Sequence, residues 1–214
     1  MNLYSISFDI STSNVGLALW DQKGKLVELK HVELKIDKNI PEQDRYLNRA
    51  DIFEEYIKNF KLRVENEYDA IIENIFVEAP LSNTPKNINT TAKLLGFNGI
   101  ACFILYKIFH KAPKLISVYE SRKLTLLDLI KYTKKRNGTI KETLSFPKNV
   151  DKKYYIWKKV SKLEPEIKWF YTRNATLKSS SFDMSDAYIV GISGLIILEI
   201  ISQNQWKERY YNIE

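Results

Sequence analysis

The sequence is poor in the residue types that build disulfides, zinc sites and glycine-rich nucleotide loops. Its 214 residues include one cysteine, two histidines and seven glycines. Cys102 has no partner for an internal disulfide, and a cysteine-based zinc site is excluded. His31 and His110 stand alone in the sequence and form no metal-binding motif. Because Cys102 lies in an apolar stretch, we expect it to pack in the core rather than act as a nucleophile.

Long hydrophobic runs are scarce as well. Residues 1–11 have neither a basic lead nor an apolar core, so no secretion signal is predicted. The apolar run Ala187–Ile201 is too short to cross a bilayer and contains two glycines, which favours a buried helix. These features predict a cytoplasmic protein without a membrane partner.

Positive charge is concentrated in the second half of the chain. Residues 1–110 contain 13 Lys and Arg against 15 Asp and Glu, whereas residues 111–178 contain 18 against 6. Aromatic residues are interleaved with the basic ones at 152–159 and 168–173. A solvated face would explain one basic helix, but so large an excess favours a polyanionic partner. Nucleic acid is therefore the expected partner.

Hydrophobic periodicity predicts an α/β fold. Strands are expected at 3–11, as a hairpin within 15–34, at 69–78 and at 114–119, and helices at 41–68, 88–110, 120–132, 151–163 and from about Asp183 onward. Residues 133–149 are polar and basic, which predicts a loop or small insertion. The expected architecture is a single domain over 1–214, with a mixed five-stranded sheet covered by helices on both faces.

Four carboxylates occupy comparable places in this pattern. Asp9 lies near the end of the first strand and Glu78 ends the central apolar strand, where unpaired charges are costly. Asp183 and Asp186 are three residues apart at the start of the last long apolar helix, so they share a face. One explanation is local: Asp183 caps the helix and Asp186 favours its dipole. The other is that all four acids converge, because ligands collect at strand ends in open α/β sheets.

Converging carboxylates would need cations to remain ionised. Oxygen-only ligands favour Mg²⁺ or Mn²⁺ over zinc or copper. Two such ions can clamp a phosphodiester for in-line attack by water. An acidic metal site beside a basic surface is the arrangement that a nuclease requires.

Three motifs carry a resemblance to a known family. "FDIS" with Asp9, "VEAPL" with Glu78, and "FDMSDAYIVG" with Asp183 and Asp186 resemble the RuvC-like Holliday junction resolvases of the RNase H-like superfamily. The stretches "NINTTAKLLGFNGI", "VYESRKL" and "DKKYYIWKKVSKL" extend the likeness over most of the chain in the family's order. The large-phage or viral branch is the nearest likeness.

The resemblance implies an RNase H-like fold and a homodimeric endodeoxyribonuclease. Its expected activity is the resolution of four-way or branched DNA junctions by paired symmetric nicks, leaving 5′-phosphate and 3′-hydroxyl ends. The four acids would hold two Mg²⁺ or Mn²⁺ ions, and Lys152 or Lys153 would lie near the scissile phosphate. Leu81 falls where several members carry an aromatic wedge. Leu81 and further positions are expected to contact DNA: Lys86, Arg122, Lys123, Lys134, Lys135, Arg136 and Lys141.

Other classes of function share parts of the pattern. An RNase H-type ribonuclease would cut RNA in RNA–DNA hybrids, and a degenerate relative would bind nucleic acid without cutting it. The stretch "DISTSNVGLALWD" also resembles the first phosphate loop of actin-like ATPases. That class needs further glycine-rich loops, and none of the seven glycines stands in a D-x-G pattern.

Overall fold

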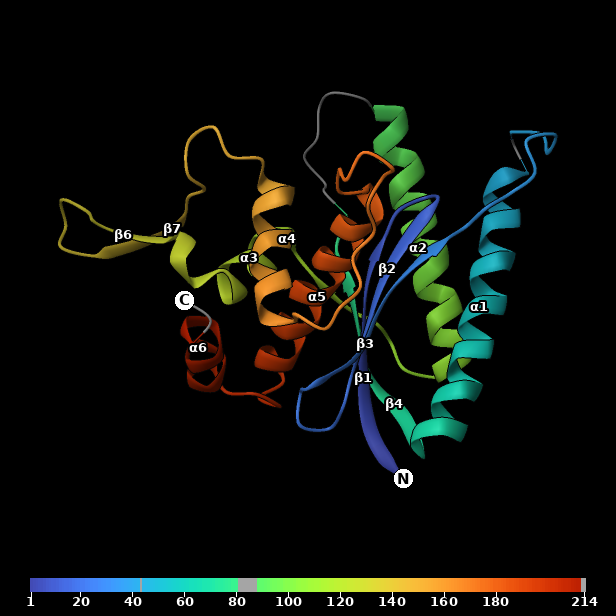
Figure 1. Ribbon diagram of the computed structural model, residues 1–214, viewed down its shortest axis with the longest axis horizontal. Helices are drawn as coiled ribbons and strands as arrows, with labels where there is room; N and C mark the ends of the chain where they lie inside the picture. Colours follow the sequence, from blue (N-terminus) through green and yellow to red (C-terminus); the bar gives the residue numbers. More distant parts are fainter. Residues whose placement is uncertain (43, 81–87, 213–214) are drawn as a thin grey trace.

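A mixed five-stranded sheet forms the centre of the computed structural model, which describes residues 1–42, 44–80 and 88–212. The strand order is β3-β2-β1-β4-β5 (Figure 1). β1 (Asn2–Ile10), β2 (Asn14–Trp20) and β3 (Leu26–Glu33) pair antiparallel as a meander. β4 (Ala70–Glu78) and β5 (Lys114–Ile116) continue the sheet in parallel with β1. The predicted α/β class and five-stranded mixed sheet are confirmed.

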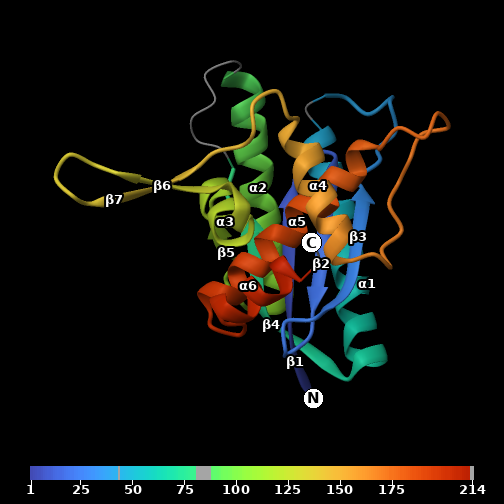
Figure 2. The same ribbon diagram turned by 60° about the vertical axis from the view of Figure 1, so that its left-hand side comes forward.

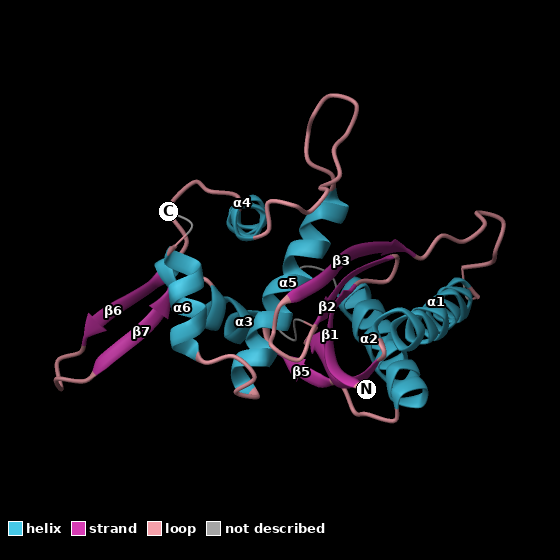
Figure 3. Ribbon diagram, turned by 60° about the horizontal axis from the view of Figure 1, so that its bottom comes forward, coloured by secondary structure: helices cyan, strands magenta, loops and turns pink. Residues whose placement is uncertain are grey.

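Helices cover both faces of the sheet, as predicted (Figure 3). α1 (Arg45–Tyr68) and α2 (Ile88–Phe109) pack on one face. α3 (Val118–Thr125), α4 (Lys152–Leu163), α5 (Ser179–Ile197) and α6 (Gln203–Tyr211) lie on the other side. Side chains alternate between faces along each strand: Phe8 and Leu17 join the α1–α2 core, whereas Ala18 joins the α5 core.

α5 approaches the sheet closely because three positions carry no side chain. A Cβ atom added to Gly191 would lie 2.3 Å from Trp20 Nε1, and one on Gly194 would lie 2.4 Å from the Phe76 ring. A Cβ atom on Gly16 of β2 would lie 2.0 Å from the carbonyl oxygen of Asp183. Glycine at these positions allows backbone and ring to meet without a gap.

α2 is the one helix among the described residues that is long and apolar enough to cross a membrane by length and composition alone, over Thr91–Phe109. Its inner side belongs to the core that α1 and the sheet share. Its outer side exposes Leu95, Phe103 and Tyr106.

The segment 133–149, predicted as a basic loop or small insertion, contains most of a β-hairpin. β6 (Ile130–Lys134) and β7 (Ile140–Leu144) pair antiparallel around a turn in which Gly138 has a φ of 81°. The hairpin projects away from the main sheet (Figure 2). Most of its residues are exposed, so the two strands bury little apolar surface against the core.

Candidate active site

The strand pairing brings Asp9 and Glu78 to the same edge of the sheet. β1 and β4 run parallel, with Phe8 paired to Val77, so the next residues, Asp9 and Glu78, lie side by side at the carboxyl ends. The alternation of side chains then decides their direction. Asp9 is two residues beyond Ser7, whose hydroxyl donates to the Ala187 carbonyl of α5. Asp9 therefore faces α5.

α5 supplies the other two carboxylates from its first two turns. The helix begins at Ser179 rather than near Asp183, and Lys178 occupies the N-cap position without a side-chain cap hydrogen bond. The expectation that Asp183 caps this helix is thus wrong, and α6 rather than α5 is the final helix. Because Gly16 has no side chain, the backbone at Asp183 can lie against β2. The helix therefore places Asp183 and Asp186 at the strand ends.

Asp9, Glu78, Asp183 and Asp186 lie close enough for the charges of the other three to affect the pKa of Asp9, and we call these four side chains the acidic tetrad. Burial, and after it the negative charge of Glu78, raises the pKa of the Asp9 carboxyl well above its ordinary value. Asp186 and Asp183 raise this pKa further, and the ammonium group of Lys153 lowers it. The residues expected to converge are therefore brought together.

Two further carboxyls of the tetrad also have raised pKa values. Burial, followed by the charge of Asp186, raises the pKa of Glu78 to about 8, against the opposing effect of Arg122 and Lys153. Burial raises the pKa of Asp186 to about 6, although Lys153 and Arg122 again lower it. Glu78 Oε2 and Asp186 Oδ1 are buried without a hydrogen-bond partner, so both oxygens stand ready to bind a cation.

The two lysines that the sequence left undecided point in different directions. Lys153 Nζ lies 4.0 Å from Asp186 Oδ2. Lys152 Nζ instead lies over the ring of Phe146, 5.6 Å from its centroid. Both belong to the first turn of α4, which Asp151 caps by accepting from the Tyr154 amide. Because adjacent helix residues point in different directions, Lys153 rather than Lys152 faces the acidic tetrad.

Arg122 of α3 was expected to contact DNA. Its surroundings place it beside the acidic tetrad. Its charge lowers the pKa of both Glu78 and Asp186. Its guanidinium carbon lies 5.9 Å from the centroid of the Phe146 ring, and its Nε is buried without a hydrogen-bond partner. Arg122 and Lys153 thus form a cationic side of the acidic tetrad.

His31 is a residue of the site that the sequence did not reveal. It lies on β3 opposite Gly16, with Nε2 3.6 Å from Asp183 Oδ2. Its ring meets that of Phe170 edge to face, with centroids 6.4 Å apart. The alternation of β3 was the available indication, because Leu29, two residues earlier, faces the α5 core. A single histidine carries no motif by which that position could be given a role.

Five of the seven remaining predicted DNA contacts belong to the described residues. Leu81 and Lys86 fall outside the described residues. Lys123 forms an ion pair with Glu142 at 2.7 Å. The other four lie exposed on or beside the hairpin: Lys134, Lys135, Arg136 and Lys141.

The acidic tetrad fits a divalent cation by its donor chemistry. Its ligands would all be carboxylate oxygens, two of them buried without a partner, which suits Mg²⁺ or Mn²⁺. Within the described parts of the chain, no group of three or more acidic, histidine or cysteine side chains is close enough together to hold a metal ion.

Comparison with solved structures agrees with this topology. Thermus thermophilus RuvC in complex with a Holliday junction substrate superimposes with a TM-score of 0.55 at 9% identity, covering 92% of this chain and 95% of that one. The Thermus thermophilus RuvC structure gives a TM-score of 0.51 at 10% identity, with the same coverage. No family model and no curated protein matches the sequence. The fold is therefore RNase H-like and of the RuvC type.

Proposed function

We propose that this protein is a metal-dependent, structure-selective endonuclease that resolves four-way or branched DNA by paired nicks. The observation that carries the proposal is the acidic tetrad, whose four carboxyl groups come from β1, β4 and α5 and influence one another's pKa. Burying several carboxylates together is costly unless cations offset their repulsion. The likeness of the fold to a resolvase that was solved with its junction substrate supports the choice of DNA.

Asp9, Glu78, Asp183 and Asp186 would hold two Mg²⁺ or Mn²⁺ ions. When bound, such ions supply Lewis-acid stabilisation of the attacking and leaving oxygens in phosphodiester hydrolysis.

The residues around the tetrad have separate tasks. Lys153, 4.0 Å from Asp186, and Arg122 would bind the scissile phosphate and stabilise the charge that develops on it. His31, 3.6 Å from Asp183, would fix the orientation of that carboxylate. The products expected are a 5′-phosphate and a 3′-hydroxyl.

The basic surface supports binding of a polyanion beside this site. A groove of about 610 Å³ runs along α4 and is lined by three lysines and two tyrosines together with Asn149, Val150 and Asp151. The hairpin adds five exposed cations: Lys131, Lys134, Lys135, Arg136 and Lys141. Both surfaces would hold junction arms through their phosphates. Membership of the large-phage or viral branch remains a prediction from the motifs.

A homodimer would place two sites across a two-fold symmetric junction. The outer face of α2 supports it, because Phe103 is 64% exposed and Tyr106 is 52% exposed. Exposed aromatic side chains on one helix face are typical of a surface that a second subunit covers.

The proposal is tested by incubating the purified protein with a labelled four-way junction, a linear duplex and an RNA–DNA hybrid, each with and without Mg²⁺. Symmetric, Mg²⁺-dependent nicks confined to the junction are expected. Cleavage of the RNA strand alone would replace the proposal with an RNase H-type activity. Binding without cleavage in both Mg²⁺ and Mn²⁺ would identify a non-catalytic nucleic-acid-binding module.

A further inference from the structure

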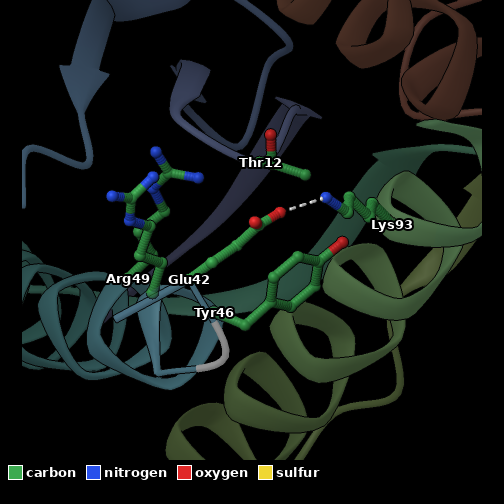
Figure 4. A pocket seen from close by; sticks show the side chains of 6 residues that line it. Thr12, Glu42, Tyr46, Arg49 and Lys93 are labelled. Carbon is green, nitrogen blue, oxygen red and sulfur yellow. Dashed lines mark hydrogen bonds and ion pairs between the residues drawn. The ribbon is translucent and has the colours of Figure 1, made fainter. Parts of the chain in front are cut away.

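A second charged pocket lies at the opposite face of the sheet from the acidic tetrad. Its volume is about 640 Å³, and it is formed by the segment after β1, the segment before α1, the start of α1 and the first half of α2 (Figure 4). Six residues line it: Thr12, Glu42, Arg45, Tyr46, Arg49 and Lys93. Three of these side chains are cationic and one is a carboxylate, so the pocket favours an anion.

Two buried polar atoms at this pocket lack a protein partner. The Tyr46 hydroxyl and Arg49 Nε are buried and accept or donate no hydrogen bond within the described chain. Packing of the Tyr46 ring edge to face against Phe97, at 5.8 Å between centroids, fixes the direction of its hydroxyl. Buried donors without partners are costly, and an anionic oxygen would satisfy both.

The cations of the pocket differ in how firmly they are held. Arg45 is anchored, with Nε donating to the Ile40 carbonyl at 2.9 Å and a terminal nitrogen donating to the Lys38 carbonyl at 3.2 Å. Lys93 forms a 2.8 Å ion pair with Glu42, but both side chains are more than half exposed. An exposed pair of this kind is worth at most about 1 kcal/mol. Lys93 can therefore exchange the Glu42 carboxylate for an incoming anion.

Tyr46 is held as a hydrogen-bond donor at neutral pH. Burial raises the pKa of its hydroxyl above the ordinary value, although Lys93 and Arg49 lower it. Lys93 and Arg49 line the same pocket as this hydroxyl (Figure 4). Arginine forks, an ammonium group and a hydroxyl donor together match the geometry of a phosphate better than that of a single carboxylate.

The pocket and the acidic tetrad lie at the same end of β1. Thr12 follows the last residue of the strand by two positions, and Asp9 precedes that residue by one. The pocket is lined by residues of α1 and α2, whereas Asp9 faces α5. A nucleic-acid strand that crosses this edge of the sheet would meet both places in turn.

We infer that this pocket binds a backbone phosphate of the same nucleic acid whose scissile phosphate lies at the acidic tetrad. The inference rests on the proposed function and adds a positioning contact to it. The strand is then held on both sides of the sheet edge, which fixes where along it the tetrad acts. Its ligand is a phosphodiester, and a free phosphate ion is the alternative source of the same chemistry.

The test compares Arg49→Gln and Lys93→Gln with Lys58→Gln, a matched loss of charge on α1 at an exposed residue paired with Glu54. Affinity for a labelled four-way junction is measured by fluorescence anisotropy over a range of salt, in Mg²⁺-free buffer. Each pocket variant is expected to bind about tenfold more weakly. The slope of log affinity against log salt should fall by about one. Lys58→Gln should match the wild type, and a thermal melt verifies that each variant is folded.

A second measurement locates the phosphate. Junctions that carry one uncharged methylphosphonate at successive positions should show a single position, away from the cleavage site, that weakens the wild type but not Arg49→Gln. Pocket variants that bind as tightly as Lys58→Gln, while the wild type still cuts the junction, would overturn the inference and leave the proposed function standing. Calorimetric binding of inorganic phosphate that Arg49→Gln abolishes, with DNA affinity unchanged, would also overturn it by assigning the pocket to the free ion.

Discussion

The two faces of the central sheet are covered by helices in different ways. On the face of α1 and α2, large side chains such as Phe8, Phe53 and Phe97 fill the space between helix and sheet. On the other face, Gly16, Gly191 and Gly194 leave room for α5 to lie directly against the strands. The first arrangement builds a core, and the second brings helix-borne carboxylates within reach of strand-borne ones.

The face of α5 places carboxyl groups close together at a cost in folding stability. The face of α5 combines close backbone contacts with carboxyls whose pKa values are raised by burial and by one another. The face of α1 carries its acids on the outside, as in the Glu54–Lys58 pair at 2.6 Å. The carboxyl groups on the face of α5 therefore repel one another, whereas the charged groups on the face of α1 are paired and solvated.

The largest expected effect is on junction cleavage, after substitution of one carboxylate of the acidic tetrad. Asp186→Asn should reduce junction cleavage by roughly a thousandfold or more, because it removes a tetrad ligand without changing side-chain size. Junction binding should persist, since the phosphate contacts lie on other residues. Asp51→Asn, an exposed acid of α1, is the matched control and should cleave like the wild type. Equal activity of both variants would remove Asp186 from the chemistry.

A second prediction concerns the glycines of the two faces. Gly191→Ala should lower the free energy of unfolding by about 1–3 kcal/mol, because its Cβ would overlap Trp20. Gly96→Ala on α2 should raise it by about 0.5–1 kcal/mol, because the nearest atom to its Cβ is a ring carbon of Tyr46 at an ordinary 3.9 Å. Urea denaturation measures both. A Gly191→Ala variant at least as stable as the wild type would mean that α5 is not held by close approach.

A third prediction is the pH dependence of stability in the absence of divalent ions. The pKa of Glu78 rises from 4.5 to about 8 and that of Asp186 from 3.8 to about 6 on folding. The folded state therefore binds more protons than the unfolded state between about pH 4 and 8, so stability should fall as pH rises through this window. Thermal melts in EDTA measure the slope. Asp186→Asn should flatten it, and Mg²⁺ should raise the melting temperature at pH 8; a metal-free stability that rises from pH 5 to 8 would contradict this prediction.

Much of the candidate site could be derived from local patterns. Asp9 and Glu78 end apolar strands, and the spacing of Asp183 and Asp186 places both on one helix face, so their convergence needed only the pairing of β1 with β4. The strand alternation that turns Asp9 toward α5 is a property of the chain itself. The strands β6 and β7 were not predicted, because they bury little apolar surface on either side.

The sequence by itself determined the α/β class, the order of most elements and the ordered set of acids, because strand and helix periods are set within a few residues of each position. Only the tertiary structure decided that Lys153 rather than Lys152 meets Asp186, that His31 lies beside Asp183, and where α5 begins. It also assembled the second pocket from three separate stretches of the chain. These outcomes depend on which side chains meet across non-adjacent elements, and that is settled by packing and not by local propensity.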